Sequence, residues 1–140
     1  MLTALIDYES GNLHSALKAF EKISSENSLG SVTITNDPEI ISNADRLVLP
    51  GDGAFPACKA ALEKSEVFEA LKHAVLAKGR PFLGICVGMQ LMAEKGFEFE
   101  PTNGLNWING QVERIQLDDP SLKIPHMGWN EIAIDYDHAI

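Results

Sequence analysis

Short apolar runs alternate with helix-like segments along most of the chain, and this alternation restricts its fold more than any other feature. Residues 2–7, 32–35, 46–49 and 81–85 are the predicted strands. Apolar residues recur with helical spacing after Asn12, within 56–63 and within 67–76, and a short helix is predicted from Pro38. Strands that alternate with helices in this way predict a parallel sheet covered on both faces. The predicted fold class is therefore α/β, in one domain over residues 1–140.

The pattern changes after Gly96, where a helix that begins behind Cys86 is predicted to stop. Asn109-Gly110 separates the apolar segments 105–108 and 111–116, and Asn-Gly is a strong signal for a two-residue hairpin turn. An antiparallel hairpin is therefore predicted toward the C-terminus, followed by one more strand at 131–134.

Charge and cysteine content exclude several classes of function. The formal net charge is −9, which disfavours binding to nucleic acid or to an anionic membrane surface. No window resembles a signal peptide or a membrane span. The two cysteines, Cys58 and Cys86, form no metal-binding or disulfide framework, so a reducing, cytoplasmic location is expected. We expect no metal and no cofactor, and the expected partners are a small molecule and another protein.

Cys86 lies at the bend between the strand 81–85 and the helix that follows. Gly84 and Gly88 stand two residues on either side of it, which allows a tight turn and the close approach of a substrate. A strand-to-helix turn exposes a nucleophile and favours its thiolate form. The alternative is a structural role, because free cysteine is often a small buried apolar residue.

A second glycine-rich turn, Pro50-Gly51-Asp52-Gly53, follows the strand 46–49. The carboxyl ends of parallel strands meet at one edge of a sheet, where active sites of α/β proteins form. Its backbone amides could stabilise the oxyanion of an acyl-transfer reaction. The alternative interpretation is an ordinary loop.

Four segments together carry a family resemblance: "GICVGMQLM", "LVLPGDGAF", "DYESGNL" and "IPHMGWNEI". The chain resembles class I glutamine amidotransferases over essentially its whole length, and within them the glutaminase subunits that work with a cyclase in imidazole glycerol phosphate synthesis. The resemblance implies a flavodoxin-like fold and a role in histidine biosynthesis. Glutamine is the implied substrate, and the cyclase subunit is the implied partner in a heterodimer.

The resemblance also implies roles for individual residues. Cys86 would attack the side-chain amide of glutamine and form a thioester. The oxyanion hole would comprise backbone groups of Gly51, Asp52, Gly53 and Val87, and the substrate would be held by Gln90 and Glu98. The cyclase would be contacted by Asn12, His126, Met127, Trp129 and Asn130.

The sequence departs from the family pattern in three places. Asp52 stands where an apolar residue is usual, and Glu9 replaces a glycine of the first loop. The family carries its catalytic His and Glu in a later H-P-E segment, which these residues do not contain, so an incomplete amidotransferase domain is expected. Each of the four histidines is predicted to be a surface or partner-facing residue; they are His14, His73, His126 and His138.

Two alternatives to an active glutaminase subunit stay open at this point. A chain without the acid–base pair could bind its partner or glutamine and hydrolyse nothing. A hydrolase of another family with a cysteine elbow shares the strand–Cys–helix pattern, although it would not explain "PGDG", Gln90 and "PHMGWN" together. Nucleotide binding is disfavoured, because neither a G-x-G-x-x-G motif nor a Walker loop is present.

Overall fold

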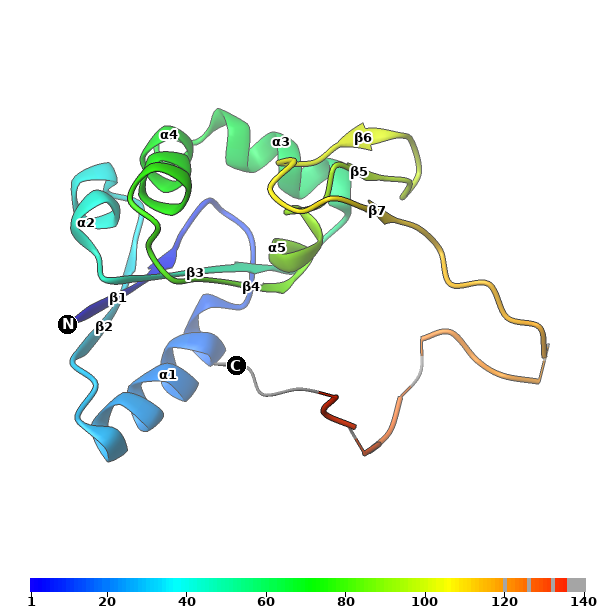
Figure 1. The fold of residues 1–140 in the computed structure, drawn as a ribbon, viewed down its shortest axis with the longest axis horizontal. Coiled ribbons are helices and arrows are strands. Elements are labelled where there is room, and N and C mark those ends of the chain that lie inside the picture. Colours follow the sequence, from blue (N-terminus) through cyan, green and yellow to red (C-terminus); the bar gives the residue numbers. More distant parts are fainter. Residues whose placement is uncertain (120, 126, 132, 136–140) are drawn as a thin grey trace.

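Four parallel strands form the central sheet of the protein (Figure 1). The computed structural model describes residues 1–119, 121–125, 127–131 and 133–135. The strands lie in the order β2-β1-β3-β4. Their bounds are β1 Leu2–Ile6, β2 Ser31–Thr35, β3 Arg46–Gly51 and β4 Phe82–Cys86. All three neighbouring pairs are parallel, which confirms the four predicted strands and the predicted sheet.

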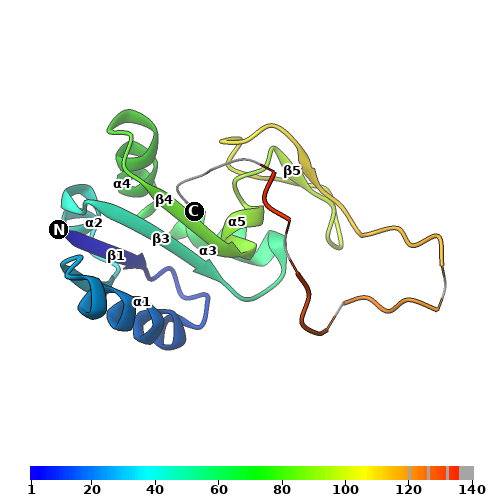
Figure 2. The same ribbon diagram turned by 60° about the horizontal axis from the view of Figure 1, so that its bottom comes forward.

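Helices cover the two faces of this sheet unequally (Figures 1 and 2). One face carries α2 (Pro38–Asn43), α3 (Phe55–Lys64) and α4 (Phe68–Lys72), which continues into the π-helical turn η1 (His73–Ala77). The other face carries α1 (Leu13–Asn27), which packs on β1 and β2. The predicted α/β class is confirmed.

The helix ends follow the expected capping chemistry. The side chain of Asp37 accepts a hydrogen bond from the Glu39 amide at 2.8 Å, and Pro38 occupies the first turn of α2. Asn12 caps α1 through the Ser15 amide at 3.2 Å. Gly79 has a φ of +63° just after η1, as expected of a residue that ends a helix.

The uneven cover leaves a groove of about 600 Å³ beside α1, on the face of β3 and β4 that lacks a helix. On the opposite face, buried apolar side chains form the hydrophobic core. Trp107 is partly buried against this core, and its ring and that of Phe82 pack edge to face with centroids 5.2 Å apart. The groove is lined by Thr3, Phe20, Ile23, Ser24, Leu29, Val32, Arg46, Leu47, Val48, Pro81, Phe82 and Leu83.

The segment after Cys86 differs from the sequence prediction. The helix α5 covers only Val87–Gln90 and does not reach Gly96. The carbonyl groups of Leu91, Met92 and Ala93 cannot continue the helix, because they accept hydrogen bonds from the backbone amides of residues 105–108. The end of α5 is therefore set by hydrogen bonds to a segment distant in sequence, and not by local helix propensity.

The same contact makes the predicted hairpin at Asn109-Gly110 wrong. Residues 105–108 bind the end of α5 instead of a partner strand. The strand β7 (Gln111–Val112) pairs in parallel with β5 (Lys95–Gly96), and β6 (Thr102–Asn103) pairs with β5 in the antiparallel sense. The antiparallel pair of this region is thus β5–β6.

Beyond Val112 the described residues form neither helix nor strand, and the chain extends away from the sheet (Figure 1). The predicted strand at 131–134 is wrong for residues 131, 133 and 134, and position 132 lies outside the described residues. No helix in the described ranges is long and apolar enough to cross a bilayer.

Candidate active site

Cys86 occupies a strained bend at the carboxyl end of β4. It is the last residue of β4 and the residue before α5, with φ 55° and ψ −118°. Positive φ is unfavourable for a residue with a Cβ and persists only where the surroundings enforce it. The side chain is exposed, as a nucleophile must be.

The neighbouring glycines enforce this bend, because the backbone around them is too close for side chains. A Cβ on Gly88 would lie 1.9 Å from the Leu49 carbonyl oxygen of β3. A Cβ on Gly84 would lie 2.5 Å from the Cα of Met89. Both distances are shorter than any van der Waals contact, so the elbow needs glycine at both positions. The predicted G-x-C-x-G elbow is confirmed as a geometric feature.

The turn 50–53 lies directly against the elbow. Gly51 is the register partner of Cys86 in the β3–β4 pair. A Cβ on Gly51 would lie 2.8 Å from the Gly88 amide nitrogen and 3.2 Å from the Val87 Cβ. The predicted proximity of Cys86 to the Gly51 turn is therefore confirmed.

The loop after β1 completes this edge of the sheet. The Gly11 amide donates a hydrogen bond to the Asp52 carboxylate at 2.9 Å, which ties the loop to the turn. Ser10 Oγ and Cys58 Sγ lie 3.2 Å apart in hydrogen-bond contact. Cys58 is buried under Gly53, so the two cysteines occupy opposite environments.

Gln90 lies at the end of α5, and Glu98 contacts the start of α3. Gln90 is the last residue of α5 and is half-buried. The Glu98 carboxylate accepts a hydrogen bond at 2.7 Å from the amide of Phe55, the first residue of α3. No side chain of the preceding residue caps α3, so Glu98 takes that function. A role of either residue in holding substrate stays a prediction.

The residues predicted to face a partner fall into two groups. Asn12 is exposed beside the turn, although its side-chain oxygen caps α1. Met127 and Trp129 are almost fully exposed in the extended segment, and Asn130 is exposed beside them. His126 lies outside the described residues. Of the other histidines, His14 and His73 are exposed, and His138 also lies outside the described residues.

The comparisons with known proteins decide the family. The family model described as "Glutamine amidotransferase class-I" matches residues 4–138. The chain belongs to the class I glutamine amidotransferase family.

Similar amidotransferases of named function come from several bacteria. A protein of Ruegeria pomeroyi is 57% identical over 141 residues, and one of Cereibacter sphaeroides is 54% identical over the same length. A protein of Caulobacter vibrioides is 51% identical over 138 residues. Each is named "Imidazole glycerol phosphate synthase subunit HisH". The alignments cover 98–100% of this chain and 65–66% of those proteins, so the chain spans about two thirds of their length.

Sequence reasoning did not single out Tyr8 and Ser10, two loop residues that lie against Gly51 and Cys58, respectively. Tyr8 is only 2% exposed, and its hydroxyl has no hydrogen-bond partner among the described residues. Burial raises the pKa of Tyr8 well above its usual range, so the hydroxyl is protonated at neutral pH. The available signal was a tyrosine directly after a buried strand, at the edge where the two glycine-rich turns were expected.

Proposed function

We propose that the chain is the glutaminase part of an imidazole glycerol phosphate synthase. It hydrolyses glutamine to glutamate and passes the ammonia to a cyclase subunit, with which it forms a cytoplasmic heterodimer. The observation that carries this proposal is an exposed cysteine with positive φ that is paired in register with a glycine-rich turn. The names of relatives that are 51–57% identical support the substrate and the partner.

The reaction follows from the arrangement of groups at the carboxyl edge. The Cys86 sulfur attacks the side-chain amide carbon of glutamine, and the carbonyl oxygen acquires negative charge. Backbone amides of the turn 51–53 and of Val87 stabilise that charge; Val87 begins a helix, where amides lack an intrahelical acceptor. The C–N bond then breaks, a proton is added to the departing nitrogen, and ammonia leaves. Water cleaves the resulting thioester and releases glutamate.

Two further predicted roles belong to this proposal. Gln90 and Glu98 hold the glutamine backbone near Cys86, and Glu98 does so while it caps α3. Asn12, His126, Met127, Trp129 and Asn130 contact the cyclase. The exposure of Met127 and Trp129 supports this surface, because aromatic anchors concentrate the energy of protein interfaces. The group that transfers protons is not assigned to any residue of the described ranges.

The first test separates the two cysteines with a glutamine-shaped diazoketone. This reagent alkylates a thiol held beside bound glutamine, and peptide mass spectrometry locates the adduct. We expect Cys86 to be labelled at least about tenfold faster than Cys58, since Cys58 is buried and bonded to Ser10. Excess glutamine should protect Cys86 alone. Equal and slow labelling of both thiols would remove the nucleophile from the proposal.

The second test measures glutamate release in the presence of the cyclase subunit. We expect release that Cys86→Ala abolishes and that the matched Cys58→Ala variant retains. Acid–base assistance contributes about 10²–10⁴-fold to such reactions, so the size of the rate reports how well protons are transferred. A labelled Cys86 without any glutamate release would contradict the glutaminase and identify a partner-binding chain.

A further inference from the structure

Tyr8 carries the one buried side-chain atom in the described ranges that lacks a hydrogen-bond partner, its hydroxyl oxygen. Buried polar groups are nearly always paired, and an unpaired one lowers the stability of the folded state. A phenylalanine would fill the same space without that cost. The hydroxyl therefore adds nothing to the stability of the fold in this state of the protein.

The position of the hydroxyl connects it to the active site. It lies 2.7 Å from the point that a Cβ on Gly51 would occupy, and the same point is 2.8 Å from the Gly88 amide nitrogen. Tyr8 thus reaches from the loop after β1 to the side of Gly51 that faces the elbow. Gly51 in turn is the register partner of Cys86.

Three polar side chains lie near the hydroxyl, those of Ser10, Cys58 and Asp52, and none of them forms a hydrogen bond with it. Ser10 and Cys58 bond to each other, and Asp52 accepts from the Gly11 amide. The backbone of the turn at Gly51 also lies close to the Tyr8 hydroxyl. Because the hydroxyl is protonated at neutral pH, it can donate a hydrogen bond to a carbonyl of this turn.

We propose that Tyr8 is a positioning residue for glutamine hydrolysis: its hydroxyl donates a hydrogen bond to the backbone of the turn 50–53 when the oxyanion forms. The bond holds the turn against the elbow, with its amides directed at the substrate oxygen. Tyr8 touches neither the substrate nor the reacting atoms. This proposal rests on the proposed glutaminase function and adds a residue to it.

Kinetics and stability together test the role of Tyr8. Tyr8→Phe should lower kcat for glutamine about tenfold, a fraction of the 10²–10³-fold loss typical when an oxyanion donor is removed. KM should stay unchanged, and the variant should resist urea as well as the wild type or better. A merely structural tyrosine would instead lose stability on substitution and keep its kcat.

Ser24 provides a matched control, because its buried hydroxyl is paired. Ser24 Oγ donates to the Gly30 carbonyl at 2.7 Å, far along α1 from the elbow. Ser24→Ala should reduce resistance to urea and leave kcat unchanged. The two hydroxyl deletions are thus expected to separate the two quantities, since Tyr8→Phe lowers only kcat and Ser24→Ala lowers only the resistance to urea. A Tyr8→Phe variant with wild-type kcat would overturn the proposal.

A spectroscopic measurement keeps this proposal separate from the proposed function. The chain has two tyrosines, so protein with ¹³C at the tyrosine Cζ gives two signals, which Tyr8→Phe assigns. In the diazoketone adduct on Cys86, a ketone oxygen stands in for the oxyanion beside the turn 50–53. Formation of this adduct should move the Tyr8 signal downfield, as hydrogen-bond donation polarises the phenol. An adduct that leaves the Tyr8 signal in place overturns the proposal for Tyr8 alone. A wild-type Cys86 that takes no label overturns both proposals.

Discussion

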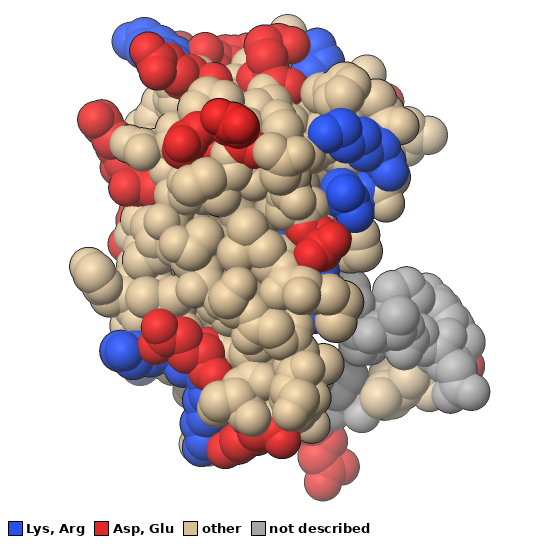
Figure 3. Space-filling view, turned by 90° about the vertical axis from the view of Figure 1, so that its left-hand side faces the viewer, with Lys and Arg blue, Asp and Glu red and all other residues tan. Residues whose placement is uncertain are grey.

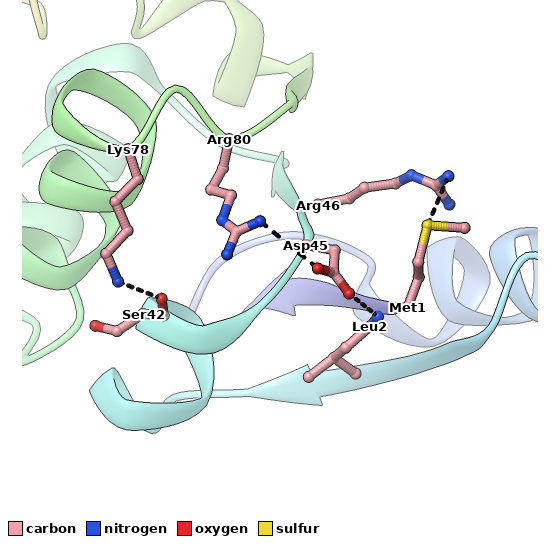
Figure 4. Close-up of polar contacts among 7 residues, drawn as sticks. All are labelled: Met1, Leu2, Ser42, Asp45, Arg46, Lys78 and Arg80. Carbon is pink, nitrogen blue, oxygen red and sulfur yellow. Dashed lines mark hydrogen bonds and ion pairs between the residues drawn. The ribbon is translucent and has the colours of Figure 1, made fainter.

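The two ends of the central sheet are held together by different means. At the amino end, long polar side chains connect neighbouring elements (Figure 4). Asp45 accepts from the Leu2 amide at 2.7 Å and pairs with Arg80 at 3.6 Å, while Lys78 donates to the Ser42 carbonyl at 2.7 Å. At the carboxyl end, backbone packs directly on backbone, as where Gly88 meets Leu49.

The two ends of the sheet differ in how well they tolerate substitutions. Flexible charged side chains at a partly exposed edge can be replaced at small cost, because water substitutes for lost partners. Figure 3 shows this end of the molecule, where acidic and basic side chains surround a broad uncharged area. Backbone contacts without free space cannot adjust in this way. The carboxyl end therefore concentrates the strain of the fold, and it is the end to which the proposed reaction is assigned.

The largest effect is expected from Gly88→Ala. The added Cβ would meet the Leu49 oxygen at 1.9 Å, so the elbow must move away from β3. Overpacking of this kind costs about 1–3 kcal/mol of unfolding free energy. Cys86 should also lose its preferential labelling. Urea denaturation and diazoketone labelling measure the two consequences.

Gly79→Ala is the control for that experiment at the amino end. Gly79 also has positive φ, but nothing lies within 4 Å of its absent Cβ. We expect a cost of about 1 kcal/mol from the backbone alone, with the labelling of Cys86 unchanged. If both alanine variants lose the same free energy of unfolding and their Cys86 is labelled at the same rate, the contrast between the two ends is refuted.

Cys86→Gly should raise the free energy of unfolding by about 1 kcal/mol, since glycine tolerates the φ of 55° that strains cysteine. Cys86→Ala removes the thiol equally well but retains a Cβ, so it should give no such gain. Both variants should lose glutamine hydrolysis. A glycine variant no more stable than the alanine variant would show that the elbow stores no strain.

Alkaline pH should destabilise the protein through Tyr8. Its pKa rises in the folded state because of burial, so above the ordinary value of 10.0 the unfolded chain loses this proton first. Stability supplied by the neutral phenol is complete below pH 10 and falls as pH increases, by at most about 1.4 kcal/mol per unit. Denaturation curves between pH 9 and pH 11 should fall less steeply for Tyr8→Phe, a comparison that cancels the titration of other groups.

The smallest effect is expected from Asp45→Ala at the amino end. The substitution removes one backbone hydrogen bond and one half-exposed ion pair, together worth about 1 kcal/mol. Labelling of Cys86 and glutamine hydrolysis should remain at wild-type levels. A large loss of hydrolysis in a folded Asp45→Ala protein would mean that the two ends are coupled.

Local sequence patterns were sufficient for most of the fold and for the centre of the site. Apolar runs located the four strands, and glycine spacing located the elbow at Cys86, because both depend on contacts close in sequence. The hairpin at Asn109-Gly110 was mispredicted, since residues 105–108 bind the end of α5 instead. The role of Glu98 as a cap for α3 was equally invisible, because the two lie 43 residues apart.

Tyr8 illustrates a further limit of prediction from sequence. Its burial follows from the apolar strand before it, but the unpaired hydroxyl depends on how three loops meet. The residue spacing within any one of those loops does not predict how the three loops pack together. Positions of this kind require coordinates, even where the sequence predicts the family and the cysteine elbow.

Strand β4 has a hydrogen-bonded neighbour only on the β3 side within the described residues. Its sequence, FLGIC, contains neither proline nor charge, the features with which proteins usually prevent exposed strands from pairing with other chains. The strand that ends at Cys86 thus presents, on its outer edge, unpaired backbone groups of the kind that can pair with a strand of another chain.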